Sequence, residues 1–255
     1  MSLQTINFST MRLSENERLL DLGCGEGRHA ISAYMTNNLN AVGIDLSVKD
    51  LKITQERFEQ FAEPDNNDKS LVITAANGEH LPFEGETFNK VICSEVLEHI
   101  PNYEAVIAEI ARVLKTGGVA AISVPRYFPE WICWQISDAY HAMDGGHIRI
   151  FDAQQLRTDI ESAGFIFYDK HHSHSLHVPY WWLKCLFWRE EGEPNAWIVD
   201  KYHAFLTWDL MKQPWITRWM DKLLNPIMGK SVVMYFVKTV QVKTVQVKTV
   251  QVKPK

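Results

Sequence analysis

Short apolar runs alternate with longer segments of helical period between residues 18 and 170. This alternation is typical of a mostly parallel sheet whose strands are joined by crossover helices. Seven runs rich in branched apolar residues are predicted to be strands, at residues 18–22, 40–44, 71–75, 91–94, 118–124, 165–170 and 231–240. The pattern therefore predicts an α/β fold with a doubly wound sheet.

Helix start and stop signals lie between these strands. Ser47 is a predicted N-cap with Asp50 three residues on, and Asp152 with Gln155 has the spacing of a reciprocal capping box. The four predicted helices begin near residue 26, run over 48–62, extend from Asn102 to Gly117 and Gly118, and run from 153 to Gly164. Local signals and hydrophobic period agree with each other, which favours the α/β fold.

Two long segments do not fit simple alternation, at residues 125–147 and 175–230. Seven of the nine tryptophans lie between Trp181 and Trp219, so the second segment is unusually aromatic. It follows the sixth strand, whose carboxyl end opens onto the edge where α/β enzymes bind substrate. We therefore expect residues 175–230 to form a helical cap, whose aromatic residues either pack on the core or hold a lipophilic substrate.

The end of the chain repeats KTVQV three times from Lys238. Because five is odd, each repeat moves its valines to the opposite face of a strand, so no continuous apolar face builds up. The sequence thus predicts a core over residues 1–174, a cap over 175–230, a last strand over 231–240 and a low-complexity tail over 241–255.

The charge is unevenly distributed along the 255 residues. Five of the 26 basic residues lie in the last eighteen positions, which leaves 21 basic and 31 acidic residues in the rest. A body with a net charge of −10 disfavours a nucleic-acid partner, because such partners require basic surfaces.

Cysteine spacing and the lack of long apolar segments indicate the cellular compartment in which we expect the protein. The four cysteines include no CxxC pair, so neither a zinc site nor a disulfide framework is predicted and a cytoplasmic location fits. No secretion signal or membrane-spanning segment is expected. Contact of the aromatic segment with a membrane surface is left open.

The run LLDLGCGEG is an apolar strand that enters a glycine-rich turn. The dinucleotide-binding pattern requires a third glycine at position 28, where this chain has Arg28. Asp45 ends the second strand about 20 residues further on, where a carboxylate can accept hydrogen bonds from both ribose hydroxyls. The alternative role for Asp45 is helix capping beside Ser47.

Four ordered motifs carry a family resemblance: DLGCGEG, GIDLS, ANGEHLPFEGETFNKVICSEVLEHIPN and RVLKTGGVAAISVP. Together they resemble the type-11 branch of the class I S-adenosylmethionine-dependent methyltransferases, which includes ubiquinone and menaquinone methyltransferases, over roughly residues 15–170. The resemblance implies a seven-stranded sheet with an antiparallel last strand. It also implies S-adenosylmethionine as cofactor and S-adenosylhomocysteine as product.

The resemblance also assigns cofactor contacts. Asp45 would hold the ribose, Leu46 would pack on the adenine, and Asn77 stands where many relatives have an Asp that accepts from the adenine amino group. An amide oxygen can still accept that bond. The remaining implied cofactor-binding residues are Asp21, Gly23 and Gly25 for the methionine part, Gly78 beside Asn77, and Ser94 and Glu95 along the sulfonium.

Methyl transfer from a sulfonium begins from an activated electrophile, so the protein mainly positions the reactants and removes a proton where necessary. Histidine titrates in the useful range. His99 lies one helical turn past Glu95, and His147 follows a loop at the carboxyl edge of the fifth strand, so both are candidate catalytic residues as well as candidate structural ones. Glu98 is interpreted as an exposed residue at a helix start.

Other candidates are assigned by position. Arg149, Trp181 and Trp208 are proposed substrate contacts. His141 and the cluster His171, His172, His174 and His177 are interpreted as less useful, the cluster as the exposed end of the sixth strand, and no metal site is predicted.

We therefore expect methyl transfer to the oxygen or carbon of a small, lipophilic acceptor. One alternative is a methyltransferase-like protein that binds the cofactor without turnover. The other is a nicotinamide-dependent oxidoreductase, which Arg28 disfavours. The acceptor and the oligomeric state are not determined by the sequence.

Overall fold

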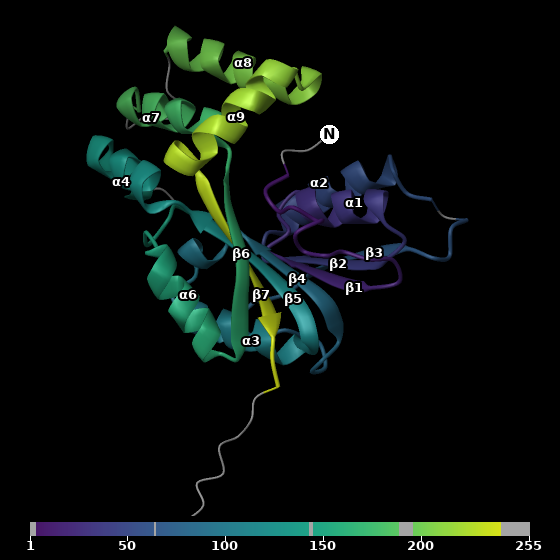
Figure 1. Cartoon of the computed structure of the whole chain (residues 1–255). Coiled ribbons are helices and arrows are strands. Elements are labelled where there is room, and N and C mark those ends of the chain that lie inside the picture. Colours follow the sequence, from purple (N-terminus) through teal and green to yellow (C-terminus); the bar gives the residue numbers. More distant parts are fainter. Residues whose placement is uncertain (1–3, 64, 143–144, 189–195, 241–255) are drawn as a thin grey trace, which may run out of the picture.

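Seven strands pair into one sheet in the order β3-β2-β1-β4-β5-β7-β6. The computed structural model describes residues 4–63, 65–142, 145–188 and 196–240. The strands are β1 (Arg18–Leu22), β2 (Asn40–Asp45), β3 (Ser70–Ala75), β4 (Phe88–Ser94), β5 (Leu114–Pro125), β6 (Phe165–Ser173) and β7 (Ser231–Lys238). Figure 1 shows the sheet from one edge, with the β7 strand lying beside β6.

The last strand runs against its neighbours. β7 is antiparallel to both β5 and β6, whereas β1 to β5 pair in parallel. Six consecutive β7 residues, from Ser231 to Phe236, are buried, because a strand in the middle of a sheet covered on both faces needs apolar side chains on both sides. The doubly wound seven-stranded sheet with an antiparallel last strand is confirmed.

Helices cover both faces of the sheet. The long cluster around Leu22 and Val91 packs under α3 and α6, and a second cluster around Leu19 and Tyr235 packs under α1 and the N-terminal segment, which contributes Ile6 and Met11. The core helices are α1 (Arg28–Thr36), α2 (Val48–Glu59), α3 (Tyr103–Val113) and α6 (Ala153–Ser162).

Local capping agrees in part with the sequence analysis. Ser47 Oγ accepts from Asp50 N at 3.2 Å, as predicted. Asp152 Oδ1 accepts from Gln154 N and Gln155 N at 2.8 and 2.9 Å. The reciprocal half of that capping box is wrong, since the Gln155 amide donates to Asp159 instead.

Several predicted boundaries are corrected. α3 ends at Val113, before Gly117, because Leu114 pairs with Phe88 and begins β5 while staying buried. α2 ends at Glu59 and β7 at Lys238, both shorter than predicted. The predicted tail, residues 241–255, lies outside the described residues.

The aromatic segment forms helices at the carboxyl end of β6, at the top of Figure 1. They are α7 (Val178–Leu186), α8 (Trp197–Lys212) and α9 (Trp215–Met228), after the short 3-10 helix η2 (Ser175–His177). The other irregular segment supplies α4 (Tyr127–Ile136) and α5 (Asp138–Ala142), and the indole of Trp182 on α7 donates to Pro129 O on α4 at 3.1 Å. The two segments therefore join in one cap.

Within the described part of the chain, no helix has both the length and the apolar character needed to cross a bilayer.

Candidate active site

A cavity of about 1900 Å³ opens at the carboxyl edge of the parallel strands. Its walls come from the turn after β1, the end of β2, the segment after β4, the end of β6 and the α8–α9 region of the cap. Loops at this edge are where α/β folds place their ligands.

The glycine turn after β1 is held against β2. Gly23 N and Cys24 N both donate to Ile44 O, at 2.8 and 2.9 Å. Gly23 has φ +71° and a Cβ there would lie 2.3 Å from Val96 Cγ2, whereas a Cβ on Gly25 (φ +50°) would have no atom within 4 Å. The turn thus needs glycine for its own shape at position 23 and leaves open space at position 25, as expected where a ligand approaches the backbone.

Asp45 connects this turn to the next helix. Its Oδ2 accepts from Gly25 N and its Oδ1 from Ser47 N, each at 2.8 Å. Ser47 itself caps α2, so Asp45 is not the N-cap. Asp45 also lines the cavity, and a carboxylate can accept more than two hydrogen bonds. It could therefore still accept from the ribose hydroxyls, and this contact stays a prediction.

Of four other predicted cofactor-binding residues, two line the cavity and two do not, within the described part of the chain. Leu46, 69% exposed, and Gly78 line the cavity. Asp21 is buried and accepts from Ala30 N at 2.9 Å; burial outweighs this bond and raises the pKa of Asp21 to about 7. Asn77 accepts from Glu79 N at 2.9 Å. Neither the buried Asp21 nor the exposed Asn77 is among the described residues that line the cavity, and their cofactor contacts stay predictions.

Glu95 follows β4 in a left-handed conformation, with φ +58°. Such a backbone costs about 1–3 kcal/mol for a residue other than glycine and persists only when its surroundings hold it. Here Glu95 N donates to Ser123 O and Ser123 Oγ donates to Glu95 Oε1, both at 3.0 Å, while Ser94 Oγ lies 2.9 Å from Ser123 Oγ. Lys230 Nζ lies 3.5 Å from Glu95 Oε2. Ser94 and Glu95 are therefore fixed at the cavity wall.

The position of Glu98 contradicts the sequence interpretation. Its side chain is 0% exposed, and it lies in a three-residue 3-10 helix, η1 (Leu97–His99), rather than at an exposed helix start. The segment that contains Ile148 covers it, since Ile148 N donates to Glu98 O at 3.0 Å. Burial, with the nearby charge of Glu95, raises the pKa of Glu98.

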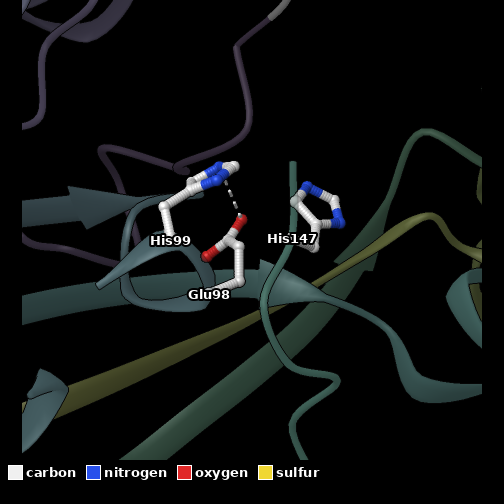
Figure 2. A group of neighbouring side chains, drawn as sticks. All are labelled: Glu98, His99 and His147. Carbon is white, nitrogen blue, oxygen red and sulfur yellow. Dashed lines mark ion pairs between the residues drawn. The ribbon is translucent and has the colours of Figure 1, made fainter. Parts of the chain in front are cut away.

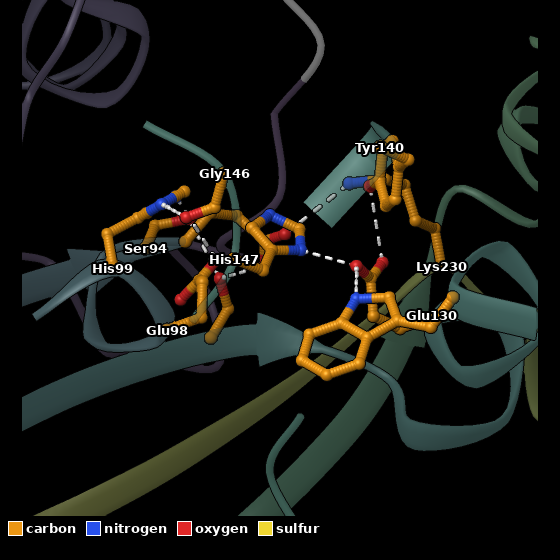
Figure 3. A network of polar contacts seen from close by, with 11 residues as sticks. Ser94, Glu98, His99, Glu130, Tyr140, Gly146, His147 and Lys230 are labelled. Atoms are coloured by element: carbon orange, nitrogen blue, oxygen red, sulfur yellow. Dashed lines mark hydrogen bonds and ion pairs between the residues drawn. The ribbon is translucent and has the colours of Figure 1, made fainter. Parts of the chain in front are cut away.

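The two candidate catalytic histidines lie together beside Glu98 (Figures 2 and 3). Their ring centroids are 5.0 Å apart. His99 lines the cavity, with Nε2 4.0 Å from Glu98 Oε1 and Nδ1 3.2 Å from Gly146 O. Burial, followed by the charge of His147, lowers the pKa of His99, which favours a neutral ring.

His147 is held by a residue that the sequence analysis missed. Its Nδ1 lies 2.6 Å from Glu130 Oε1 on α4, and Glu130 also accepts from the Trp134 indole at 3.2 Å. Figure 3 shows this network, which includes Tyr140. Burial alone would raise the pKa of Glu130, but the hydrogen bond and charge of His147 outweigh it and lower that pKa. No sequence spacing connects Glu130 to His147.

The three predicted substrate residues lie away from the cavity lining in the described part of the chain. Arg149 donates to Pro101 O at 2.7 Å, and Trp208 is 46% exposed on α8. Trp181 packs against a small cap core that contains Tyr140. Their substrate roles remain predictions.

The histidines near the end of β6 are not an exposed strand end, which corrects that interpretation. His174 is buried, and His171, His172 and His177 line the cavity with it. The N-terminal segment covers them, because Thr5 O lies 3.1 Å from His171 Nε2 and Thr5 Oγ1 lies 3.0 Å from His174 Nε2. The His141 side chain lies outside the described residues.

This sheet order, together with a glycine turn between β1 and α1 at the edge of a large cavity, defines the Rossmann-like class I methyltransferases. The family model described as "Methyltransferase domain" matches residues 4–167. The chain belongs to this methyltransferase domain family.

Curated relatives include both carbon and oxygen methyltransferases. The sterol 24-C-methyltransferase erg6 of Schizosaccharomyces pombe is 35% identical over 140 residues, which cover 55% of this chain and 34% of that protein. The ubiquinone biosynthesis O-methyltransferase of Paracidovorax citrulli is 35% identical over 104 residues, or 41% of this chain and 42% of that protein. The matched region thus spans 34% of the length of one relative and 42% of the other.

Solved structures share the fold over most of this chain. A putative methyltransferase from Bacillus halodurans superimposes with a TM-score of 0.62 at 19% identity, over 91% of this chain and 96% of that one.

Proposed function

We propose that this chain transfers a methyl group from S-adenosylmethionine to an oxygen or carbon atom of a small, lipophilic acceptor. One observation carries the proposal: a single cavity is lined both by the glycine turn with Asp45 and by Glu95 and His99. Groups suited to hold a nucleoside and groups suited to move a proton therefore face the same space.

The residues around the turn fit the cofactor. Gly23 and Gly25 would give its methionine part close access to the backbone, Asp45 would accept from the ribose, and Leu46 would offer the adenine an apolar surface. When bound, S-adenosylmethionine supplies a methyl group on a positively charged sulfur. The chain itself positions the acceptor, and its His99 and His147 are the groups proposed to take a proton from it.

The acceptor class is supported by the relatives and the cap. The two relatives named above are, by name, a sterol methyltransferase and a ubiquinone-biosynthesis methyltransferase. The cap presents large exposed apolar side chains, among them Trp215 at 78% exposed, and such surfaces commonly mark binding sites. A cytoplasmic setting is part of the proposal and fits the four free, buried cysteines.

Cofactor identity is tested by thermal unfolding of the purified chain. S-adenosylhomocysteine should raise the melting temperature by binding the native state, while NAD and NADP should not. Asp45→Ala should weaken S-adenosylhomocysteine binding roughly tenfold to hundredfold, because hydrogen bonds to charged groups are worth about 1.5–3 kcal/mol. Asp68→Ala, an exposed acid outside the cavity, is the matched control.

Stabilisation by NAD alone would overturn the proposal. Turnover is then measured by incubating a metabolite extract with S-adenosylmethionine labelled in its methyl group and finding, by mass spectrometry, which compound gains the labelled methyl group in place of a hydrogen. Cofactor binding with no labelled product from any extract would favour a binding protein without turnover.

A further inference from the structure

Glu98, His99 and His147, here called the Glu98 cluster, form a compact set of metal-ligand atoms. One ligand atom from each residue lies within 4.8 Å of those of the other two. Figure 2 shows the Glu98 carboxylate below the His99 ring and beside the His147 ring. Such a set differs from a surface acidic patch because its carboxylate is fully buried.

The Glu98 carboxylate has no other partner. Within the described part of the chain, both of its oxygens are buried and neither has a hydrogen-bond partner. A buried carboxylate without a partner is costly, and proteins usually pair such a group or use it to coordinate a metal. The nearest positive candidate, His99 Nε2, is 4.0 Å away, beyond hydrogen-bond distance.

In the described part of the chain, the hydrogen-bonded ring nitrogen of both histidines is Nδ1, and His99 Nε2 lies 4.0 Å from the Glu98 carboxylate. His147 Nδ1 contacts Glu130 Oε1 at 2.6 Å, and His99 Nδ1 contacts Gly146 O at 3.2 Å. A carboxylate and a carbonyl only accept hydrogen bonds, so each Nδ1 carries a hydrogen, and the Nε2 of such a ring has a lone pair for a metal ion when the ring is neutral. Metal-binding histidines are typically oriented in this way by a carboxylate or carbonyl on the other ring nitrogen.

We propose that the Glu98 cluster binds a divalent transition-metal ion such as Zn²⁺ or Mn²⁺. Two imidazoles and one carboxylate suit these ions and leave coordination positions open. The cluster stands at the cavity, because His99 lines it and the covering segment reaches it at Gly145. An open coordination position on the metal ion would therefore face the bound acceptor.

This site rests on the proposed function and makes it more specific, because it favours an acceptor with a hydroxyl group. A metal ion lowers the pKa of a hydroxyl bound to it. The acceptor O–H bond then breaks, the oxygen keeps the electron pair and the proton passes to solvent water. In this form of the site, His99 and His147 hold the ion instead of taking the proton themselves.

The test measures metal binding directly. The full chain is dialysed against a chelator, and Co²⁺ is titrated in as a coloured probe while equilibrium dialysis with elemental analysis counts bound ions. We expect one Co²⁺ per chain. Glu98→Gln and His147→Ala should weaken its binding more than Glu130→Gln, for which the loss should be roughly 10–100-fold, as for outer-shell partners.

His80→Ala is the control, since His80 is an exposed histidine outside the cluster and should leave Co²⁺ binding unchanged. Circular dichroism checks that each variant is folded, and Glu98→Gln keeps the side-chain shape. A wild-type chain that takes up no Co²⁺ overturns the proposal, as does uptake that is unchanged in both Glu98→Gln and His147→Ala.

The result of the metal-binding test can be distinguished from the result of the cofactor-binding test. S-adenosylhomocysteine binding without Co²⁺ binding would reject the metal site alone. Co²⁺ binding at the Glu98 cluster without S-adenosylhomocysteine binding would support the site and reject the methyltransferase activity.

Discussion

At the scale of single residues, the two glycines of the turn after β1 have different surroundings. A Cβ on Gly23 would meet the Val96 side chain, whereas a Cβ on Gly25 would project into open cavity space. Both have positive φ, so each replacement also carries backbone strain. The difference in stability between the two alanine variants therefore measures the overlap with Val96.

Gly25→Ala should lower the free energy of unfolding by about 1 kcal/mol, because its only cost is backbone strain. The same variant should bind S-adenosylhomocysteine more weakly. Gly23→Ala should destabilise the fold more, because its methyl group also overlaps Val96. Thermal unfolding with and without the ligand measures both effects. Equal loss of stability in the two variants would show that position 25 is not open.

At the scale of elements, the cap is tied to the sheet through α9. Asp221 Oδ1 accepts from Ser175 Oγ at 2.5 Å and from Leu176 N at 3.1 Å, and Asn225 Oδ1 accepts from Ser175 N at 3.0 Å. These bonds fix α9 over η2, where β6 ends beside the cavity. The orientation of the cap thus depends on a few polar contacts as well as on its aromatic packing.

Asp221→Ala should loosen this junction and raise the Michaelis constant of the acceptor more than it weakens S-adenosylhomocysteine binding, because the glycine turn and Asp45 lie on other elements. Lys222→Ala, an exposed neighbour on the same helix, is the control. Steady-state kinetics and ligand titration give the two quantities. If the Asp221→Ala variant does not fold, α9 is required for the stability of the core rather than for acceptor binding alone.

At the scale of the whole molecule, the seven described strands all lie before residue 241. β7 ends at Lys238, and Thr239 N donates to Gly164 O at 3.0 Å just beyond it. Among the described residues, the paired strands and the cavity lining come from positions before 240. Stability and cofactor binding should therefore be properties of the preceding chain.

Deletion of residues 243–255 should leave the melting temperature and the affinity for S-adenosylhomocysteine unchanged, because the five-residue repeat presents no continuous apolar face to pack on the sheet. Thermal unfolding and titration of the truncated and full chains check this. A lower melting temperature or weaker binding in the truncated chain would show that the repeats support the fold.

Local patterns in the sequence determined the strands of the sheet and the position of the glycine turn. Strands repeat on a two-residue period and helices on 3.6, so apolar spacing identified β1 to β7 and the core helices before any contact was known. The turn at Gly23 and Gly25 and the acid at Asp45 were recognisable for the same reason, since the residues concerned lie close together in the chain or at a fixed spacing.

Tertiary structure alone decided what covers each side chain. Glu98 looks like an exposed residue by its local sequence, and it is buried because the segment around Ile148 folds over it. Likewise, α3 stops at Val113 because Leu114 pairs with Phe88 across the sheet. Periodicity records which face of an element is apolar, but not which distant segment packs there, so the Glu98 cluster with its Glu130 support could emerge only from the folded chain.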